Sequence, residues 1–317
     1  MTNKNTWDIA VVGGANMDYL VRGRALPKPG ETVMGDLFQE APGGKGANQA
    51  VAATRLGARA GLVARVGRDE RGKAIVKRLK KEGVATKYID KDEKEATGVA
   101  LILVGQGGEK EILTAPGANL QLNINQIRDA AKMIQSARIL LAQLEVPLEA
   151  LMLTVRLAHQ AGAKVFLDPS PPISLPDELL QMVSVIKPNA SEAEALTGIQ
   201  VRDRNSARNA AKALIERGVG AVAVQAGDEG NLIVTSQHEH WFPKIPVQSV
   251  DATGAGDAFA AALAVALLEE RPWQEAGAWA SAAAALKTTK LGAQAGLPTR
   301  DQILALLAKE EIKTHVF

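Results

Sequence analysis

Residues 251–257, Asp-Ala-Thr-Gly-Ala-Gly-Asp, combine a glycine-rich turn with a carboxylate just before a small, apolar run, 258–268, that is compatible with a helix. A helix N-terminus leaves several backbone N–H groups unpaired at the positive end of the helix dipole, which suits an anion. Glycines also let the backbone approach a phosphate closely. An anion site beside the carboxylate of Asp257 favours phosphoryl transfer, although the same pattern also occurs as a purely structural helix start.

A second glycine-rich segment, residues 43–50 (Gly-Gly-Lys-Gly-Ala-Asn-Gln-Ala), again precedes a helical run. Lys45 and Asn48 supply hydrogen-bond donors, and the side-chain amides can also accept, so this group suits a ligand held through several hydroxyls. It is neither a Walker A loop nor a dinucleotide-binding turn, because both spacings are absent. The alternative is a structural turn in which the two glycines close a tight bend.

Polar side chains also follow two of the apolar runs that we expect to be strands. Asn16 and Asp18 follow the first run, and at this spacing in extended chain their side chains face the same way. Glu145 follows the run that ends at Gln143. As isolated residues these are typical of turns and solvated loops. At the carboxyl ends of parallel strands, however, they would converge on one ligand.

Residues 189–194, Asn-Ala-Ser-Glu-Ala-Glu, follow a proline and begin another expected helix. Asn189 is a natural N-cap, and Glu192 stands at the third position of a capping-box pattern. This structural interpretation has a functional alternative, in which Asn189 and Glu192 organise a hydrated Mg²⁺ near nucleotide phosphates.

Short apolar runs alternate with segments of helical periodicity along the chain. The runs that indicate buried strands are residues 9–12, 60–64, 139–142, 165–167, 183–186 and 219–224. The segments that indicate helices are residues 72–81, 124–135, 148–161 and 206–217. This alternation predicts an α/β fold with a doubly wound, mostly parallel sheet flanked by helices.

Residues 16–41 and 98–117 break the alternation, since they contain β-rich stretches joined by glycine-rich turns. We expect them to form a small β-sheet lid over the carboxyl ends of the core strands, where open α/β sheets bind ligands. The core would then comprise residues 1–15, 42–97 and 118–317. The alternative is a pair of ordinary surface hairpins. Exposed edges of such hairpins often pair, so we expect a homodimer formed through the lid.

The composition excludes several classes of protein. The 317 residues include 37 Lys and Arg against 35 Asp and Glu, a net charge of +2 that is too balanced for a nucleic-acid surface. The absence of cysteine excludes disulfides, thiolate zinc sites and a cysteine nucleophile, and fits a reducing compartment. The first residues lack a hydrophobic signal region, and the longest apolar run is too short to cross a bilayer. We therefore expect a cytoplasmic protein that acts on small molecules.

Together, the motifs at residues 13–18, 43–53, 189–194 and 251–257 resemble those of the PfkB family of carbohydrate kinases, in the same order and spacing over nearly the whole chain. The resemblance implies ATP as donor, Mg²⁺ bound largely through phosphates and water, and phosphorylation of ribose at O5 to give ribose 5-phosphate and ADP. It implies that Asp257 accepts the proton of the attacking hydroxyl, beside an anion hole formed by Gly254, Ala255 and Gly256. The sugar-binding residues that it implies, besides Asp257, are Asn16, Asp18, Gly44, Lys45, Asn48 and Glu145.

The resemblance also implies a nucleotide site and a monovalent cation. The nucleotide-binding residues would be Asn189, Glu192, Gln225, Gly227, Gly230 and Gly256, with Gln225 at a position where threonine is frequent. The cation, usually K⁺, would lie near the anion hole, held mostly by backbone carbonyls. The residues that match are Asp251, Thr253, Lys287, Lys290, Gly292 and Gly296. Two of them depart from the family pattern, because Gly296 replaces a frequent serine and Lys287 replaces a small residue. K⁺ activation is nevertheless the expectation.

Three alternatives stay open at this point. A kinase for deoxyribose, fructose or a nucleoside would share the mechanism, but a nucleoside needs an aromatic or apolar shelf, and Phe, Trp and Tyr make up only 3% of the chain. A sugar-binding regulator without catalysis would have lost Asp257 or the glycine turn, and both are intact. A dehydrogenase that uses NAD would need a dinucleotide fingerprint after the first strand, and residues 13–16 do not provide it.

Overall fold

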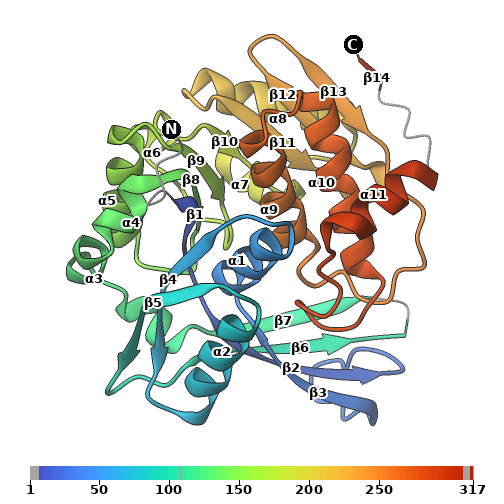
Figure 1. The fold of residues 1–317 in the computed structure, drawn as a ribbon. Coiled ribbons are helices and arrows are strands. Elements are labelled where there is room, and N and C mark those ends of the chain that lie inside the picture. The colour runs from blue at the N-terminus through green and yellow to red at the C-terminus, as the bar shows by residue number, and fades with distance from the viewer. Residues whose placement is uncertain (1–6, 107–108, 310–314, 317) are drawn as a thin grey trace.

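The computed structural model describes residues 7–106, 109–309 and 315–316, which form two separate β-sheets (Figure 1). The larger sheet has ten strands. In order across the sheet they are β14 (His315–Val316), β13 (Glu239–Phe242), β12 (Asn231–Thr235), β11 (Ala221–Gln225), β10 (Val185–Ile186), β9 (Lys164–Asp168), β8 (Ala137–Gln143), β1 (Trp7–Val12), β4 (Ala60–Gly67) and β5 (Ala85–Asp92). The neighbours from β5 to β11 are parallel, and those from β11 to β14 are antiparallel.

Both faces of this sheet are buried, as strand β1 illustrates. Ile9 and Val11 belong to one apolar cluster, whereas Ala10 and Val12 belong to another, because successive side chains of a strand point to opposite faces. The first cluster is completed by α1 (Lys45–Arg55), α2 (Glu70–Lys81), α9 (Ala255–Leu268), α10 (Trp273–Thr288) and α11 (Arg300–Lys309). The second is completed by α3 (Ile124–Asp129), α4 (Ala131–Ser136), α5 (Leu148–Gln160), α6 (Asp177–Leu180), α7 (Ala190–Thr197) and α8 (Arg204–Glu216).

Two predicted elements differ in detail from the structure. The segment 124–135 is two helices rather than one, because the N–H of Met133 donates to the carbonyl of Ala130 in a tighter turn that separates α3 from α4. In the predicted strand 183–186, only Val185 and Ile186 pair in the sheet, since the N–H of Val183 bonds back to Leu180 at the end of α6.

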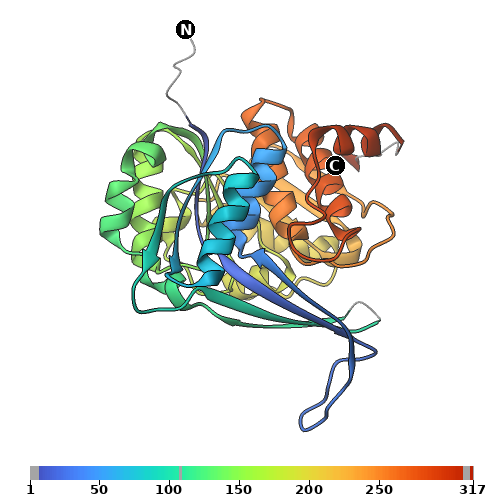
Figure 2. The same ribbon diagram turned by 60° about the horizontal axis from the view of Figure 1, so that its bottom comes forward.

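The smaller sheet has four strands in the order β3 (Gly35–Gly43), β2 (Asn16–Gly23), β6 (Gly98–Val104) and β7 (Lys110–Ala115). Strands β2 and β3 form one antiparallel hairpin, β6 and β7 form another, and the hairpins join through parallel pairing of β2 with β6. Figure 2 shows these strands extending beyond the core. The predicted fold class, a large and mostly parallel sheet with a small separate sheet, is confirmed. None of the described helices is both long and apolar enough to span a membrane.

Arg55, in the last turn of α1, connects that helix to the segment before α11. Its Nη1 donates to the carbonyls of Gln294 at 3.0 Å and Leu297 at 2.7 Å. Its Nε and Nη2 each donate to one oxygen of Glu82 at 2.8 Å. The Arg55 and Glu82 side chains are only 19% and 13% exposed, so removal of the guanidinium would leave the largely dehydrated Glu82 paired with Arg78 alone and two carbonyls without this donor.

We predict that Arg55→Met lowers the free energy of unfolding by about 2–3 kcal/mol, as expected when one partner of a largely buried ion pair is removed. A matched control is Arg156→Met, which removes an ion pair with Glu178 whose side chains are 47% and 62% exposed. Arg156→Met should lower the free energy of unfolding by less than about 1 kcal/mol. Urea denaturation measures both values, and equal effects would contradict this role of Arg55.

Candidate active site

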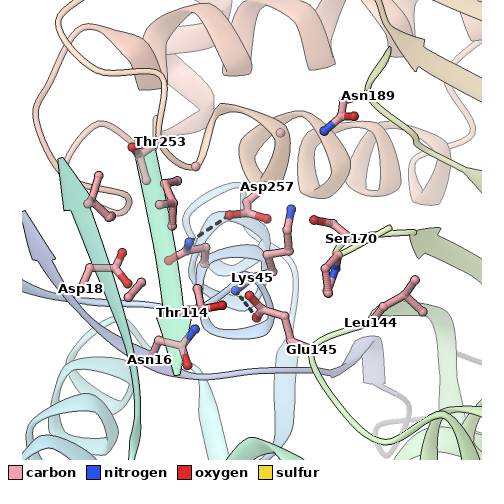
Figure 3. Close-up of a pocket in the computed structure, with 18 of the residues that line it drawn as sticks. Asn16, Asp18, Lys45, Thr114, Leu144, Glu145, Ser170, Asn189, Thr253 and Asp257 are labelled. Atoms are coloured by element: carbon pink, nitrogen blue, oxygen red, sulfur yellow. Dashed lines mark hydrogen bonds between the residues drawn. The ribbon is translucent and has the colours of Figure 1, made fainter. Parts of the chain in front are cut away.

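A cavity of about 630 Å³ lies between the carboxyl ends of the parallel strands and one face of the small sheet. This size suits a small-molecule ligand. Side chains from both sheets and from α1, α7 and α9 enclose it (Figure 3). The residues predicted from the sequence that line the cavity are Asn16, Asp18, Gly44, Lys45, Asn48, Glu145, Asn189, Glu192, Gln225, Thr253, Gly254, Gly256 and Asp257. The structure therefore brings together motifs that are far apart in the chain.

The glycine-rich turn begins α9 at the wall of this cavity. Gly254 is the N-cap, with φ of 82°, a conformation that residues with a side chain rarely adopt. A Cβ at this position would also lie only 2.7 Å from the carbonyl oxygen of Ala293. The first amides of α9 have no partner within the helix, and that of Ala255 donates instead to the carbonyl of Ala252 at 3.1 Å. The turn thus presents the amides of Gly256 and Asp257 at the positive end of a 14-residue helix.

Two side-chain amides orient the carboxylate of Asp257. Asn48 Nδ2 donates to Oδ2 at 2.9 Å, and Gln49 Nε2 donates to Oδ1 at 3.2 Å (Figure 3 shows the bond from Asn48). The Gln49 amide is itself oriented by Gln143, whose Nε2 donates to Gln49 Oε1 at 2.6 Å. Asp257 is 4% exposed and lines the cavity. Its carboxylate is therefore fixed in direction by neutral donors and can accept a proton from a bound ligand.

Asp168, which the sequence analysis did not select, connects the two lysines of the site. Its Oδ2 lies 3.2 Å from Lys45 Nζ, and its Oδ1 lies 3.4 Å from Lys187 Nζ. Burial raises the pKa of Asp168, but the two lysines outweigh this effect and hold it below its ordinary value. Lys187 also reaches the glycine turn, since its Nζ lies 2.8 Å from the position that a Cβ on Gly256 would occupy.

The other end of the cavity is rich in carboxylates. Glu145 Oε2 accepts from the backbone N–H of Lys45 at 2.8 Å (Figure 3). Burial, reinforced by the charges of Glu145 and Asp257, raises the pKa of Asp18 to about 8. Burial also raises the pKa of Glu145 to about 7, although the charge and N–H of Lys45 act in the opposite direction. At neutral pH these carboxyls can therefore both donate and accept hydrogen bonds, as a ligand with several hydroxyls requires.

Asn16 is held by a residue that the sequence analysis also missed. Its Oδ1 accepts from Asn119 Nδ2 at 2.7 Å, and Asn119 Oδ1 accepts from the N–H of Ala15 at 2.9 Å. The Asn16 amide is thus fixed by a neighbour from the segment that follows the small sheet.

Asn189 and Glu192 form the capping box that their spacing predicts. Asn189 Oδ1 accepts from the N–H of Glu192 at 2.9 Å, and Glu192 Oε2 accepts from the N–H of Asn189 at 2.8 Å. Both residues also line the cavity, and Glu192 Oε1 is not used in the cap. The structural interpretation is therefore confirmed, and it leaves one carboxylate oxygen that fits a hydrated Mg²⁺.

The remaining predicted nucleotide residues follow β11. Gln225 lines the cavity, and its backbone bridges to that of Asn189. Gly227 and Gly230 bound the next short turn, η2 (Gly227–Glu229), and do not line the cavity. Gly230 packs against β13, because a Cβ there would lie 2.3 Å from the carbonyl oxygen of Phe242. Ala255 likewise stands in the first turn of α9 without lining the cavity.

The residues predicted to bind K⁺ gather behind the glycine turn, but a side chain takes the place expected for the ion. Lys287 Nζ donates to the carbonyls of Asp251 at 2.9 Å and Lys290 at 3.2 Å. The Asp251 carboxylate accepts from the N–H groups of Thr253 and Gly292, each at 2.8 Å. Burial lowers the pKa of Lys287 to about 8. Because an ammonium group already uses these carbonyls, K⁺ does not fit here, contrary to the expectation from the resemblance.

The sequence carried a signal for the residues that were missed. Asp168 ends the apolar run 165–167 and Lys187 ends the run before Pro188, the same kind of position that selected Glu145. Polar residues at the ends of parallel strands therefore form a more complete guide to this site than the glycine motifs alone.

Comparison with known proteins identifies relatives over nearly the whole chain. The ribokinase of Haemophilus influenzae is 40% identical over 299 residues, covering 94% of this chain and 98% of that protein. A deoxyribokinase of Salmonella typhi is 32% identical over 305 residues, covering 96% and 100%. The structure of Arabidopsis thaliana ribokinase complexed with ribose and ATP matches with a TM-score of 0.85 and 32% identity, covering 95% and 99%.

The family described as "pfkB family carbohydrate kinase" matches residues 7–300. This match spans all four sequence motifs and nearly all of the described fold. It excludes the dehydrogenase and confirms the family resemblance. The chain belongs to the pfkB family of carbohydrate kinases.

Proposed function

We propose that this protein transfers the γ-phosphoryl group of ATP to O5 of ribose, giving ribose 5-phosphate and ADP. The observation that carries the proposal is the position of Asp257, which is oriented by Asn48 and Gln49 beside the glycine turn of α9, inside a cavity rich in polar side chains. Ribose is favoured over deoxyribose because the ribokinase relative is the more similar of the two, at 40% against 32% identity. A nucleoside is disfavoured because none of the described residues lining the cavity is aromatic.

The chemistry follows from this arrangement. A bond forms between the sugar oxygen and the γ-phosphorus, the bond to the β-phosphate oxygen breaks, and the hydroxyl proton passes to Asp257. Phosphoryl transfer needs mainly alignment and stabilisation of charge on the transferred group. The amides of Gly256 and its neighbours in the turn, together with Lys187 Nζ, would stabilise that charge. Asn16, Asp18, Lys45 and Glu145 would hold the sugar hydroxyls.

Mg²⁺ would neutralise phosphate charge when bound with the nucleotide. The described residues contain no group of three or more His, Cys, Asp or Glu side chains that could hold a metal ion, so phosphates and water must provide most of the ligands. Asn189 and Glu192 fit contacts to that hydration shell, because both line the cavity near the anion site. Gln225 would contact the nucleotide from the end of β11.

The small sheet is proposed to act as a lid and as the contact between two copies of the chain. One face carries Asp18, Ala100 and Ile112, which line the cavity. The opposite face carries exposed apolar side chains that are adjacent across the strands, Val21, Phe38, Leu101 and Leu113. The half-buried Tyr19 and the exposed Glu40 and Glu111 lie on the same face. An exposed apolar sheet face of this kind is typical of an interface, which supports a homodimer.

The pKa of Asp18 leads to a pH-dependent prediction. The folded protein keeps a proton on this carboxyl up to about pH 8, whereas the unfolded chain loses it above about pH 4. The contribution of Asp18 to the free energy of unfolding therefore falls as the pH rises between these values. Asp18→Asn should raise the melting temperature by a few degrees more at pH 8 than at pH 5, and should weaken ribose binding about tenfold or more.

Thermal unfolding at both pH values and calorimetric ribose titration provide these measurements. Asp90→Asn, at an exposed position of β5, is the matched control and should change neither the melting temperature nor the affinity for ribose. The same shift at pH 5 and pH 8 would contradict a raised pKa for Asp18.

The proposed reaction is tested by measuring ADP release with ATP, Mg²⁺ and a panel of ribose, deoxyribose, fructose and nucleosides. We expect the highest kcat/KM with ribose. Asp257→Asn should keep ribose binding but lower kcat about 10²–10⁴-fold, because it removes the proton acceptor and keeps the shape. A stronger reaction with another acceptor would change the substrate but keep the mechanism. Binding of ribose without any turnover in the unmodified protein would indicate a sugar-binding regulator.

The dimer proposal predicts that charge on the exposed lid face separates the two copies. Phe38→Glu combined with Leu113→Glu alters side chains that are 65% and 71% exposed, so the monomer fold should persist. Size-exclusion chromatography with light scattering should show a dimer for the unmodified protein and a monomer for this variant. Leu304→Glu changes an apolar residue on α11 that is 47% exposed and should leave the dimer intact. A monomeric unmodified protein at all concentrations would contradict the proposal.

A further inference from the structure

Lys287 is a buried charge with an unusual set of partners. It lies in the last turn of α10, its side chain is fully buried, and it donates to two backbone carbonyls, those of Asp251 and Lys290. A buried ammonium group is tolerated only when acceptors or opposite charges replace its hydration. Here carbonyl dipoles and the nearby Asp251 carboxylate take that role. This is the environment that a protein builds for a small cation.

The Lys287 ammonium group lies directly behind the anion site. From Asp251, whose carbonyl accepts from Lys287, the chain runs through Thr253 to Gly254, the N-cap of α9. The Asp251 carboxylate fixes this segment by accepting from the N–H of Thr253, and it fixes the loop behind by accepting from the N–H of Gly292. Positive charge at Lys287 therefore holds the backbone that presents the phosphate-binding amides and adds to their field.

The second departure from the family pattern is linked to the first. A Cβ on Gly296 would lie 2.3 Å from the carbonyl oxygen of Lys287, so the backbone of Lys287 approaches this position too closely for any side chain. A serine at position 296 could not provide a cation ligand with the chain in this arrangement. The glycine at 296 and the backbone of residue 287 thus belong to one local structure, and neither the glycine nor a serine in its place would provide a side-chain ligand for a cation.

We propose that the Lys287 ammonium group substitutes for the monovalent cation, so that the charge supporting the anion site is part of the chain and the protein needs no K⁺. The proposal rests on the proposed function, since the anion site it supports is that of phosphoryl transfer. K⁺ cannot share the carbonyls of Asp251 and Lys290 with the ammonium group, because two positive charges at this separation repel strongly in a buried site. Lys287 is a positioning residue, acting through residues 251–254.

The test compares kcat in KCl with kcat in tetramethylammonium chloride at equal ionic strength, since tetramethylammonium is too large for the site. The unmodified protein should be equally active in both salts. Lys287→Ala removes the charge and opens space, so kcat should fall about 10–100-fold in tetramethylammonium and recover in KCl. Lys287→Met removes the charge but fills the space, so its kcat should fall similarly and KCl should not restore it. Lys212→Ala, at an exposed position of α8, is the control.

A second readout does not depend on turnover. KCl, relative to tetramethylammonium chloride, should raise the melting temperature of Lys287→Ala but not that of the unmodified protein or Lys287→Met. Activation of the unmodified protein by K⁺, or a folded Lys287→Ala that responds to K⁺ in neither measurement, would overturn the proposal. If no sugar is phosphorylated in any salt, the proposed function is wrong. The melting temperatures then still decide whether Lys287 substitutes for K⁺. If Lys287→Ala does not fold, the response of the unmodified protein to K⁺ decides it.

Discussion

The buried carboxylate of Asp168 is the interaction on which the arrangement of this site depends. It is 2% exposed and lies between Lys45, on the side of the carboxylate-rich pocket, and Lys187, on the side of the glycine turn. Charges this deeply buried are stable only in partnership, because removal of one leaves the others without compensation. The three side chains come from α1, from the end of β9 and from the residue after β10, so their pairing connects α1 to two strands of the large sheet.

Asp257, unlike Asp168, is held by side-chain amides rather than by lysines. Gln143 donates to Gln49, and Gln49 and Asn48 each donate to one oxygen of Asp257. Neutral donors fix the direction of a carboxylate without holding its charge as strongly as an ammonium group would. Gln49 also donates to Asp168 at 3.0 Å, so the residue proposed to accept a proton and the residue that balances the lysines share one support. Orientation and charge balance are thereby separated between two aspartates.

Much of this could be predicted from the sequence, for identifiable reasons. The strands of a buried parallel sheet appear in the sequence as short apolar runs, and their carboxyl ends lie along one edge of the sheet. Asn16 and Glu145 could therefore be placed in one site from the sequence alone. Asp168 could not be distinguished from an ordinary strand terminator, because its importance depends on lysines far away in the chain. For Lys287 the sequence indicated an unusual residue but not the position of its amine, which depends on carbonyls of Asp251 and Lys290 brought together by folding. The break between the two helices in residues 124–135 could not be predicted, because the segment contains no glycine or proline.

The small sheet has its own apolar cluster, formed by Leu20, Ala100, Ile102 and Val104, which is separate from the two clusters of the main sheet. Ala100 and Ile102 also line the cavity opposite the glycine turn. Substitutions there can reshape the pocket for a different acceptor while the packing of α9 and the backbone of the glycine turn stay unchanged. The residues that select the substrate and those that perform the chemistry therefore belong to different parts of the fold and can change independently. A duplicated gene of this kind could therefore acquire a new sugar substrate through changes at a few positions of the small sheet.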